Sequence, residues 1–417
     1  MLTSQTMSNE VQRIQDLETP AVLLDVNRLE SNIGRFQDIA DREGVALMPH
    51  VKSTKTPQIW EMQASHGAKG FVAATLKEAE TVMDTHSGEA PFNNVLIAYP
   101  HVNPRALQKI ERLIQRHGAQ VGLLVANDFG GEIVYRHFKG SESGMPEIYL
   151  AVDTGLHREG ISPRGDESMQ TIMHLADIFK EKLVGISTHA GHVYKKNSPV
   201  KVRRIARGER DQMIRFAERC RLEAGVTLRE IGLGSTPTVN FFRNNQEGGS
   251  SITQVHPGNY AFMDNLQVGL GVAKPNECAL TVLATVVDKR VFREKVPGKK
   301  GYRERGLIIT DAGSKTTSSD SKPHGLTGAS IYGAVYEDIR GEDLLDGVNV
   351  TALSEEHGKM MVPRSMLDQP IAVVGGKIRV LVQHACPVTN LAGDCGGIYV
   401  VDGERVIDNW KVTAAGH

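Results

Sequence analysis

Short apolar runs alternate with charged, amphipathic runs from about Pro20 to about Asp264, and this alternation constrains the fold more than any other feature. The runs between them, such as Val26–Glu43, carry Leu, Ile or Met at helical spacing. Strands that are each followed by a helix indicate parallel βα units. The expected strands are Ala21–Asp25, Val45–His50, Gly70–Ala74, Asn94–Ala98, Gln120–Ala126, Glu147–Asp153, Lys182–His189 and Leu228–Gly234.

About eight such units over about 240 residues predict an α/β fold of the (β/α)8 TIM-barrel type rather than a doubly wound sheet. No Gly-rich dinucleotide fingerprint follows the first expected strand, which also argues against a Rossmann fold. After about Leu270, β-branched residues dominate and helical spacing weakens, which predicts a β-rich C-terminal domain. Its expected strands are Ala279–Arg290, Gly306–Asp311, Val348–Leu353, Lys377–His384 and Gly397–Val401.

The chain of 417 residues is long enough for two hydrophobic cores. We expect a barrel over residues 20–268 and a β-rich domain over residues 269–417, to which residues 1–19 are added. Within the second domain, Lys295–Arg305 is basic and contains Gly, so we expect a solvated hairpin tip.

The composition is that of an ordinary globular protein, with 40% hydrophobic residues, 23% charged residues and a net charge of -1. This charge gives no electrostatic reason to expect nucleic acid or an anionic membrane as a partner. No run approaches about 18 apolar residues, and the polar N-terminus does not resemble a secretory signal. Few, scattered cysteines predict a reduced, cytoplasmic setting. The cysteines are Cys220, Cys278, Cys386 and Cys395.

Lys52 follows the expected strand Val45–His50. The carboxyl ends of barrel strands carry active sites, so a lysine there can point into the barrel mouth. Partial desolvation can lower the pKa of such an amine and make it nucleophilic. The alternative, a surface lysine extending from a strand end, is equally compatible with the spacing.

Two Gly-containing turns are found late in the expected barrel, at Ile231–Thr238 and at Pro257–Tyr260. Gly lets backbone N–H groups approach an anion, and Ser and Thr add hydroxyl donors, so the turns form a candidate phosphate cradle. A single Gly turn is usually only a turn. The pattern is not the phosphate loop of nucleotide-hydrolysing enzymes.

Further polar residues follow other strands. Arg158 could face the ring nitrogen of a cofactor and His189 could stack on its ring, although each is individually more often structural. His384 and Cys386 stand at the end of the strand that is expected over Lys377–His384. Residues two apart on a strand project from one face. Imidazole and thiolate together make a plausible half-site for zinc, against the alternative of a core cysteine beside a structural histidine.

Taken together, these blocks resemble the D-serine dehydratase and D-threonine aldolase family, whose first domain is of the alanine racemase type. The resemblance spans nearly the whole chain in the same order. The blocks are Asp16–Asp25, His50-Val51-Lys52, Arg158-Glu159-Gly160, Gly234-Ser235-Thr236, Gly258–Asp264, Asp311–Lys315, Glu356-His357-Gly358 and His384-Ala385-Cys386.

The resemblance implies a fold type III pyridoxal-phosphate enzyme that forms a homodimer. Lys52 would hold pyridoxal 5′-phosphate as a Schiff base, and Arg158 would lie near the pyridine nitrogen. His384 and Cys386 would bind a divalent metal beside the β-hydroxyl of a β-hydroxy D-amino acid. The remaining cofactor contacts would be His189, Tyr194, Gly234, Ser235, Thr236, Gly258, Asn259 and Tyr260.

Two details favour elimination of the β-hydroxyl, as in a D-serine or D-threonine dehydratase, over aldol cleavage. The aldolase branch tends to carry His-x-Asp, whereas this chain has His-Ala-Cys at 384–386. Its Thr188–Tyr194 segment also looks more like the dehydratase branch. A thiolate favours zinc, whereas a carboxylate suits manganese or magnesium. Two departures stand against this reading: Thr54 replaces a common family His, and Pro387–Asn390 looks aldolase-like.

Three alternatives remain open besides D-threonine aldolase. Alanine racemase shares the barrel but needs no metal and takes a second base from a Tyr of its β domain. A non-enzymatic carrier of pyridoxal phosphate would resemble the barrel alone. A purely structural interaction protein would leave Lys52 and the two Gly turns unexplained.

Overall fold

The computed structural model describes residues 12–295, 298, 301–321, 330–393 and 396–416. Part of the expected hairpin tip and Cys395 lie outside the described residues. Two compact units divide the described chain: unit 1 holds residues 12–29, 275–321 and 330–411, and unit 2 holds residues 30–274 and 412–416, apart from the gaps just given.

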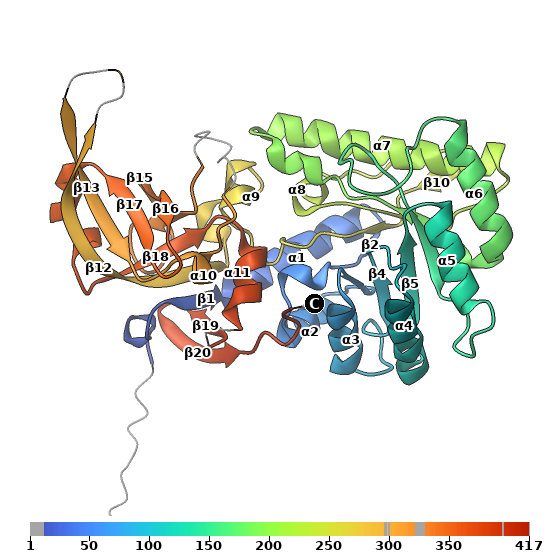
Figure 1. The fold of residues 1–417 in the computed structure, drawn as a ribbon, viewed down its shortest axis with the longest axis horizontal. Coiled ribbons are helices and arrows are strands. Elements are labelled where there is room, and N and C mark those ends of the chain that lie inside the picture. Colours follow the sequence, from blue (N-terminus) through green and yellow to red (C-terminus); the bar gives the residue numbers. More distant parts are fainter. Residues whose placement is uncertain (1–11, 296–297, 299–300, 322–329, 394–395, 417) are drawn as a thin grey trace, which may run out of the picture. The chain divides into compact units, whose positions relative to one another are not determined.

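Unit 2 is a barrel of eight parallel strands surrounded by helices (Figure 1). The strand order is β2-β11-β8-β7-β6-β5-β4-β3, and a parallel bridge between His50 and Val72 joins the two ends of this sheet. The prediction of a barrel is therefore confirmed. The strands are β2 (Ala46–Leu47), β3 (Phe71–Ala73), β4 (Asn94–Ile97), β5 (Gln120–Val125), β6 (Glu147–Ala151), β7 (Leu183–Ser187), β8 (Glu230–Leu233) and β11 (Gln254–Val255).

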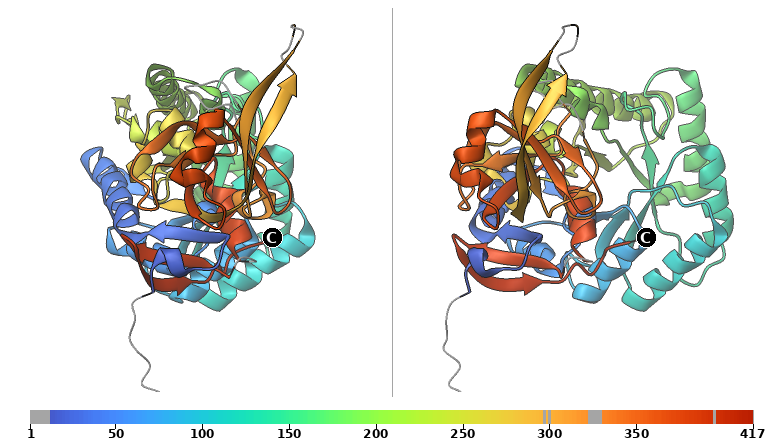
Figure 2. Two further views of the ribbon diagram at one scale, coloured as in Figure 1. Left: turned by 90° about the vertical axis from the view of Figure 1, so that its left-hand side faces the viewer. Right: turned by 60° about the vertical axis from the view of Figure 1, so that its left-hand side comes forward.

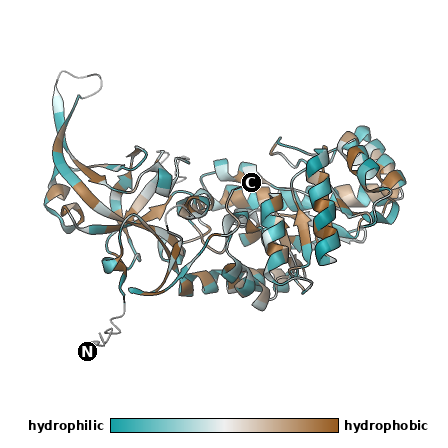
Figure 3. Ribbon diagram, turned by 60° about the horizontal axis from the view of Figure 1, so that its bottom comes forward, coloured by the Kyte–Doolittle hydropathy of each residue, from teal (hydrophilic) through white to brown (hydrophobic). Residues whose placement is uncertain are grey.

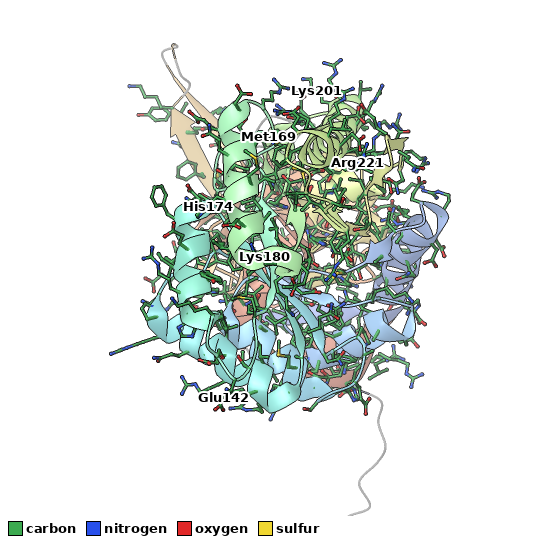
Figure 4. All side chains as sticks on the ribbon, turned by 90° about the vertical axis from the view of Figure 1, so that its right-hand side faces the viewer. Glu142, Met169, His174, Lys180, Lys201 and Arg221 are labelled. Carbon is green, nitrogen blue, oxygen red and sulfur yellow. The ribbon has the colours of Figure 1, made fainter. Side chains whose placement is uncertain are left out.

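The helices of the barrel are amphipathic, and Figure 3 shows polar and apolar residues alternating along them. Several begin at a local capping signal: the Thr75 hydroxyl accepts the N–H of Glu78, and Ser198 caps the long α7. Lys201 and Arg221 mark the two ends of α7 in Figure 4. The helices are α1 (Val26–Arg42), α2 (Pro57–Ser65), α3 (Leu76–Thr85), α4 (Pro104–His117), α5 (Asp128–Phe138), α6 (Asp166–Phe179), α7 (Pro199–Glu223), α8 (Thr236–Asn240) and α9 (Asn265–Gly269).

One expected barrel strand belongs elsewhere. β1 (Ala21–Asp25) pairs antiparallel with β12 and parallel with β19 in unit 1. The eighth barrel strand is instead β11, whose residues Gln254 and Val255 pair with β2 and β8. All five residues of β1 are buried, and a strand buried on both faces carries no pattern that identifies its sheet. β11 was not predicted because two residues are too few to show a periodicity.

Unit 1 is built on a ten-stranded, mainly antiparallel sheet, so the prediction of a β-rich domain is confirmed. β12 pairs with β1 and β18 through its first half and with β13 through its second half, and Figure 2 shows the hairpin of β12 and β13 projecting. Its elements besides β1 are β12 (Leu280–Lys295), β13 (Tyr302–Thr310), α10 (Ser314–Thr317), β14 (Gly333–Tyr336), β15 (Leu344–Val350), β16 (Ala352–Leu353), β17 (Gly358–Val362), β18 (Lys377–Val382), α11 (Ala385–Ala392), β19 (Ile398–Asp402) and β20 (Arg405–Trp410).

No helix within the described ranges is both long enough and apolar enough to cross a membrane.

Candidate active site

A pocket opens at the mouth of the barrel in unit 2, where the segments after β2, β6, β7 and β8 meet. Four predicted residues from these segments line it: Lys52, Arg158, His189 and Gly234. The apolar lining residues are Val72, Ala98, Leu124, Ala151, Val152 and Leu156.

Lys52 lies in a short 3-10 turn, Val51–Ser53, directly after the bridge that closes the barrel. The Lys52 N–H donates to Nδ1 of His50 at 3.5 Å. Burial, and then the nearby Lys52 charge, hold the pKa of His50 well below its usual value. His50 is therefore a neutral acceptor that orders the turn bearing the lysine.

The residues after Lys52 anchor this turn in the protein interior. Thr54 is buried, and its hydroxyl accepts the indole N–H of Trp60 at 2.8 Å. Thr54 is not among the pocket-lining residues, so its hydroxyl stabilises the fold here instead of facing a ligand. Lys55 adopts a positive φ of 52° and its Nζ lies 2.7 Å from Oε1 of Glu78, and both side chains are buried. This buried ion pair holds the strained position in place.

His189 presents a neutral ring to the pocket. Its Nδ1 donates to the carbonyl oxygen of Gly234 at 3.0 Å. Burial is the main cause that lowers the pKa of His189 to about 3, and the charge of Lys52 adds to it. A flat, uncharged ring with a fixed edge is suited to packing against an aromatic cofactor.

Arg158 reaches the pocket from a loop folded back on the end of β6. Gly160 has a φ of +98°, and a Cβ there would lie 2.7 Å from the carbonyl carbon of Ala151, so only glycine fits. Arg158 donates from Nε and Nη2 to the carboxylate of Glu159, which also lines the pocket and raises the arginine pKa. A permanent cation therefore stands at the mouth, paired with a carboxylate.

The two Gly turns have the properties of a phosphate cradle. A Cβ on Gly258 would lie 2.9 Å from Oγ of Ser53, so this turn packs directly against the turn of Lys52. The hydroxyl of Thr236 is buried, and no hydrogen-bond partner for it lies among the described residues. A buried hydroxyl without an acceptor is costly, and a phosphate oxygen would supply one. The residues present thus fit a phosphorylated cofactor.

Thr236, Gly258 and the remaining predicted cofactor residues do not line the pocket. Tyr260 is buried against Phe36, with ring centroids 4.9 Å apart. The side chain of Asn259 donates to Asp264 at 2.5 Å. Tyr194 is half-buried in the 3-10 helix Gly191–Lys195, and Ser235 lies 3.1 Å from the hydroxyl of Thr238. Their contacts with a cofactor stay predictions.

His256 lines the pocket but was missed. Its Nε2 lies 3.0 Å from Oε1 of Gln254, and burial lowers its pKa to about 4. It follows β11, the strand that the sequence pattern did not reveal, so its place at a strand end was hidden. The proline and glycine at 257–258 were the available signal.

Glu209 of α7 was also missed, although it supports two site segments from behind. It is buried, and its Oε1 accepts the N–H of Ala190, the neighbour of His189, at 3.0 Å. Burial raises its pKa to about 7, with opposing contributions from hydrogen bonds of Thr238 and Gly234. The signal was present: Glu209 falls at helical spacing with Ala206 on the buried face of α7.

His384 and Cys386 belong to unit 1, and their expected geometry is wrong. β18 ends at Val382, His384 precedes α11, and Cys386 lies in the first turn of that helix. The pair is thus presented by a strand-to-helix turn and not by one face of a strand. Cys386 is half-buried and forms no disulfide in the described part of the chain.

His384 donates from Nδ1 to Oδ2 of Asp320 at 2.6 Å. No group of three or more His, Cys, Asp or Glu side chains within the described ranges is arranged to hold a metal ion. Two protein ligands of nitrogen and sulfur type fit an open zinc site, in which substrate or water completes the coordination. The donor types present therefore fit a metal, although two ligands are one fewer than a catalytic zinc site usually takes from the protein.

Comparison with known proteins identifies the family. The profile for the alanine racemase N-terminal domain matches residues 24–266, and that for a putative serine dehydratase domain matches residues 279–398. D-threo-3-hydroxyaspartate dehydratase from Delftia sp. (strain HT23) is 30% identical over 374 residues, covering 89% of this chain and 91% of the relative. The chain belongs to the D-serine dehydratase and D-threonine aldolase family. It is a pyridoxal-phosphate-dependent lyase.

Other members of the family differ in their named reaction. D-serine dehydratase from Dictyostelium discoideum is 25% identical, covering 95% of this chain and 96% of the relative. D-threonine aldolase from Arthrobacter sp. is 26% identical, covering 96% of this chain and 93% of the relative. Membership alone therefore does not choose between elimination and aldol cleavage.

Solved structures of the family superpose closely on this chain. The Delftia sp. HT23 dehydratase has a TM-score of 0.81 at 26% identity, covering 97% of this chain and all of that one. A cysteine-to-alanine mutant of D-threo-3-hydroxyaspartate dehydratase, described as the metal-free form, has a TM-score of 0.78 at 26% identity, with the same coverage. Metal binding is thus a property of at least one relative.

Proposed function

We propose that this lyase is a metal-assisted dehydratase of β-hydroxy D-amino acids, which converts them to a 2-oxo acid and ammonia. The observation that carries the proposal is the barrel-mouth pocket, in which Lys52 stands with the neutral ring of His189 and the Gly234 turn. Bound pyridoxal phosphate supplies an electron sink for the electron pair left at Cα when its proton departs.

The residues of the pocket have separate tasks in this proposal. Lys52 would hold the cofactor through Nζ and would take the Cα proton from one face only, which would restrict turnover to one enantiomer. His189 would pack against the ring of the cofactor, and Arg158 would bind near its ring nitrogen. Thr236 and the Gly234 and Gly258 turns hold the phosphate, because Thr236 has a buried hydroxyl that needs an acceptor.

The metal pair decides the bond that breaks. Hydroxide is a poor leaving group, so a Lewis acid on the β-oxygen would assist its departure. The thiol of Cys386, two residues after the imidazole of His384, favours zinc, the metal that suits this task, over manganese or magnesium. The second candidate is D-threonine aldolase, supported by the aldolase-like Pro387–Asn390 and by the 26% identity with the Arthrobacter enzyme.

The products separate these reactions directly. We expect pyruvate from D-serine, 2-oxobutyrate from D-threonine or oxaloacetate from D-threo-3-hydroxyaspartate, each with ammonia. The L-enantiomers should not react. Glycine and acetaldehyde from D-threonine would establish the aldolase instead, and interconversion of D- and L-alanine would establish a racemase.

The variant Lys52→Ala tests whether Lys52 attaches the cofactor. Activity should fall by roughly 10³-fold or more, because both the covalent link and the base are removed. The wild-type protein should be yellow, and borohydride should fix its cofactor to a peptide containing Lys52. A Lys52→Ala protein that still carried a borohydride-fixed cofactor on another lysine would contradict the assignment.

A further inference from the structure

Asp320 lies 64 residues before His384 in the sequence, yet their side chains meet at 2.6 Å in unit 1. Asp320 follows α10 by three residues, and its N–H donates to the hydroxyl of Ser318 at 3.1 Å. Ser318 holds a φ of +70°, a conformation that favours glycine, so the turn places the aspartate at some local cost. Both side chains are partly exposed, at 22% for His384 and 31% for Asp320.

The contact differs from the other histidine–carboxylate pairs in the described part of the chain. It is the shortest of them. Like the pair of His157 and Asp153 at 2.8 Å, it engages Nδ1, but that pair joins residues four apart whereas this one spans 64 residues. His86 with Glu61 is at 3.0 Å, for comparison, and joins two exposed side chains through Nε2. At His384 the bond engages Nδ1, which places the proton of a neutral imidazole on that nitrogen and the lone pair on Nε2.

We propose that Asp320 is the positioning residue of the metal centre: it fixes the tautomer and orientation of His384 so that Nε2 is presented to the ion. The proposal rests on the metal-binding role of His384 in the proposed function and adds to it a residue that no motif indicated. A carboxylate on the far nitrogen orients a ligating imidazole and makes it more basic. Asp320 would act on the metal only through its contact with His384.

Metal affinity of the purified holoenzyme tests this directly. Zinc would be titrated in competition with a chromophoric chelator, so that the readout is a dissociation constant and not activity. We expect Asp320→Ala to weaken zinc binding by about 10- to 100-fold. The zinc affinity of Asp320→Asn should lie between those of Asp320→Ala and the wild type, because the amide oxygen of the asparagine still accepts the Nδ1 proton but carries no charge.

Two controls bracket these variants. His384→Ala should lose the site, whereas Glu61→Gln, which alters a histidine–carboxylate pair of unit 2, should leave zinc affinity unchanged. The tautomer provides a second readout: in ¹⁵N spectra of the metal-free protein, His384 should be protonated at Nδ1 in the wild type. Asp320→Ala should shift it towards the Nε2-protonated form. The His384 signal would be assigned by its loss in His384→Ala.

The outcomes distinguish this proposal from the one on which it rests. If the wild type binds no zinc, the metal role in the proposed function fails. If His384→Ala abolishes binding but both Asp320 variants stay within about twofold of the wild type, only the positioning role fails. Should Asp320→Ala not fold, Asp320→Asn, which is nearly identical in shape, decides the matter.

Discussion

The barrel-mouth pocket of unit 2 and the His384 turn of unit 1 reach their chemistry by different routes. The pocket gathers residues from all eight barrel strands and the segments that follow them, and burial lowers the pKa of His189 to about 3 and that of His256 to about 4. The His384 turn uses three consecutive residues and one carboxylate contact, and its side chains are partly exposed. Burial therefore sets the protonation of the histidines in the pocket. At the His384 turn, the kinds of donor atom set the chemistry instead.

Removal of metal should have the largest effect and should separate the two regions. Chelator treatment or His384→Ala should lower dehydratase activity by about 10²- to 10³-fold, because a Lewis acid contributes several kcal/mol to such a step. The visible absorption of the cofactor should not change, since its donors lie in the other unit. Activity and absorption would be recorded on the same dialysed sample.

Metal replacement completes that test. Zinc should restore the chelated wild type better than manganese, and Cys386→Asp should shift the preference towards manganese. Full activity in protein shown by elemental analysis to be metal-free would show that His384 and Cys386 are ordinary structural residues. The His384 turn would then have no catalytic role beside the pocket.

Glu209 tests whether burial governs the pocket. Its folded-state pKa of about 7 exceeds the ordinary 4.5, so its contribution to stability is complete below pH 4.5 and is lost as pH rises through 7. That difference corresponds to at most about 3 kcal/mol. The glutamine in the Glu209→Gln variant does not titrate. The free energy of unfolding of this variant, relative to that of the wild type, should therefore rise by about this amount between pH 4.5 and pH 8.

Urea unfolding would measure this, followed by the fluorescence of Trp60 in a Trp410→Phe background so that only unit 2 reports. Glu209→Leu is the matched control: it cannot accept the Ala190 N–H and should be less stable at every pH. A Gln variant with the same pH slope as the wild type would show that Glu209 is not the titrating group.

Thr236 gives the smallest expected effect and tests one hydrogen bond of the proposed phosphate cradle. Thr236→Val should weaken pyridoxal-phosphate binding by about 10- to 100-fold, the value of a hydrogen bond to a charged group. Thr236→Ser keeps the hydroxyl and should bind within a few-fold of the wild type. Equal affinities of the Val and Ser variants, measured by equilibrium dialysis, would remove Thr236 from the phosphate site.

The sequence by itself determined the features that are encoded locally. The alternation of apolar and amphipathic runs predicted the barrel, because each βα unit carries its own pattern within about 30 residues. Lys52, Arg158, His189 and Gly234 were found because each follows a strand that shows clearly in the sequence, and the strands of a parallel barrel end at one mouth.

Only the tertiary structure decided what depends on partners distant in the chain. The strand at Ala21–Asp25 is buried at all five positions and shows no alternation, so nothing local showed that it pairs with β12 and β19 and leaves the eighth barrel position to β11. His256 was not predicted because it follows β11, which the sequence pattern did not show. Asp320 meets His384 across 64 residues, and a hydrogen bond of that span leaves no periodic trace in a sequence, because it is set by how the whole sheet folds.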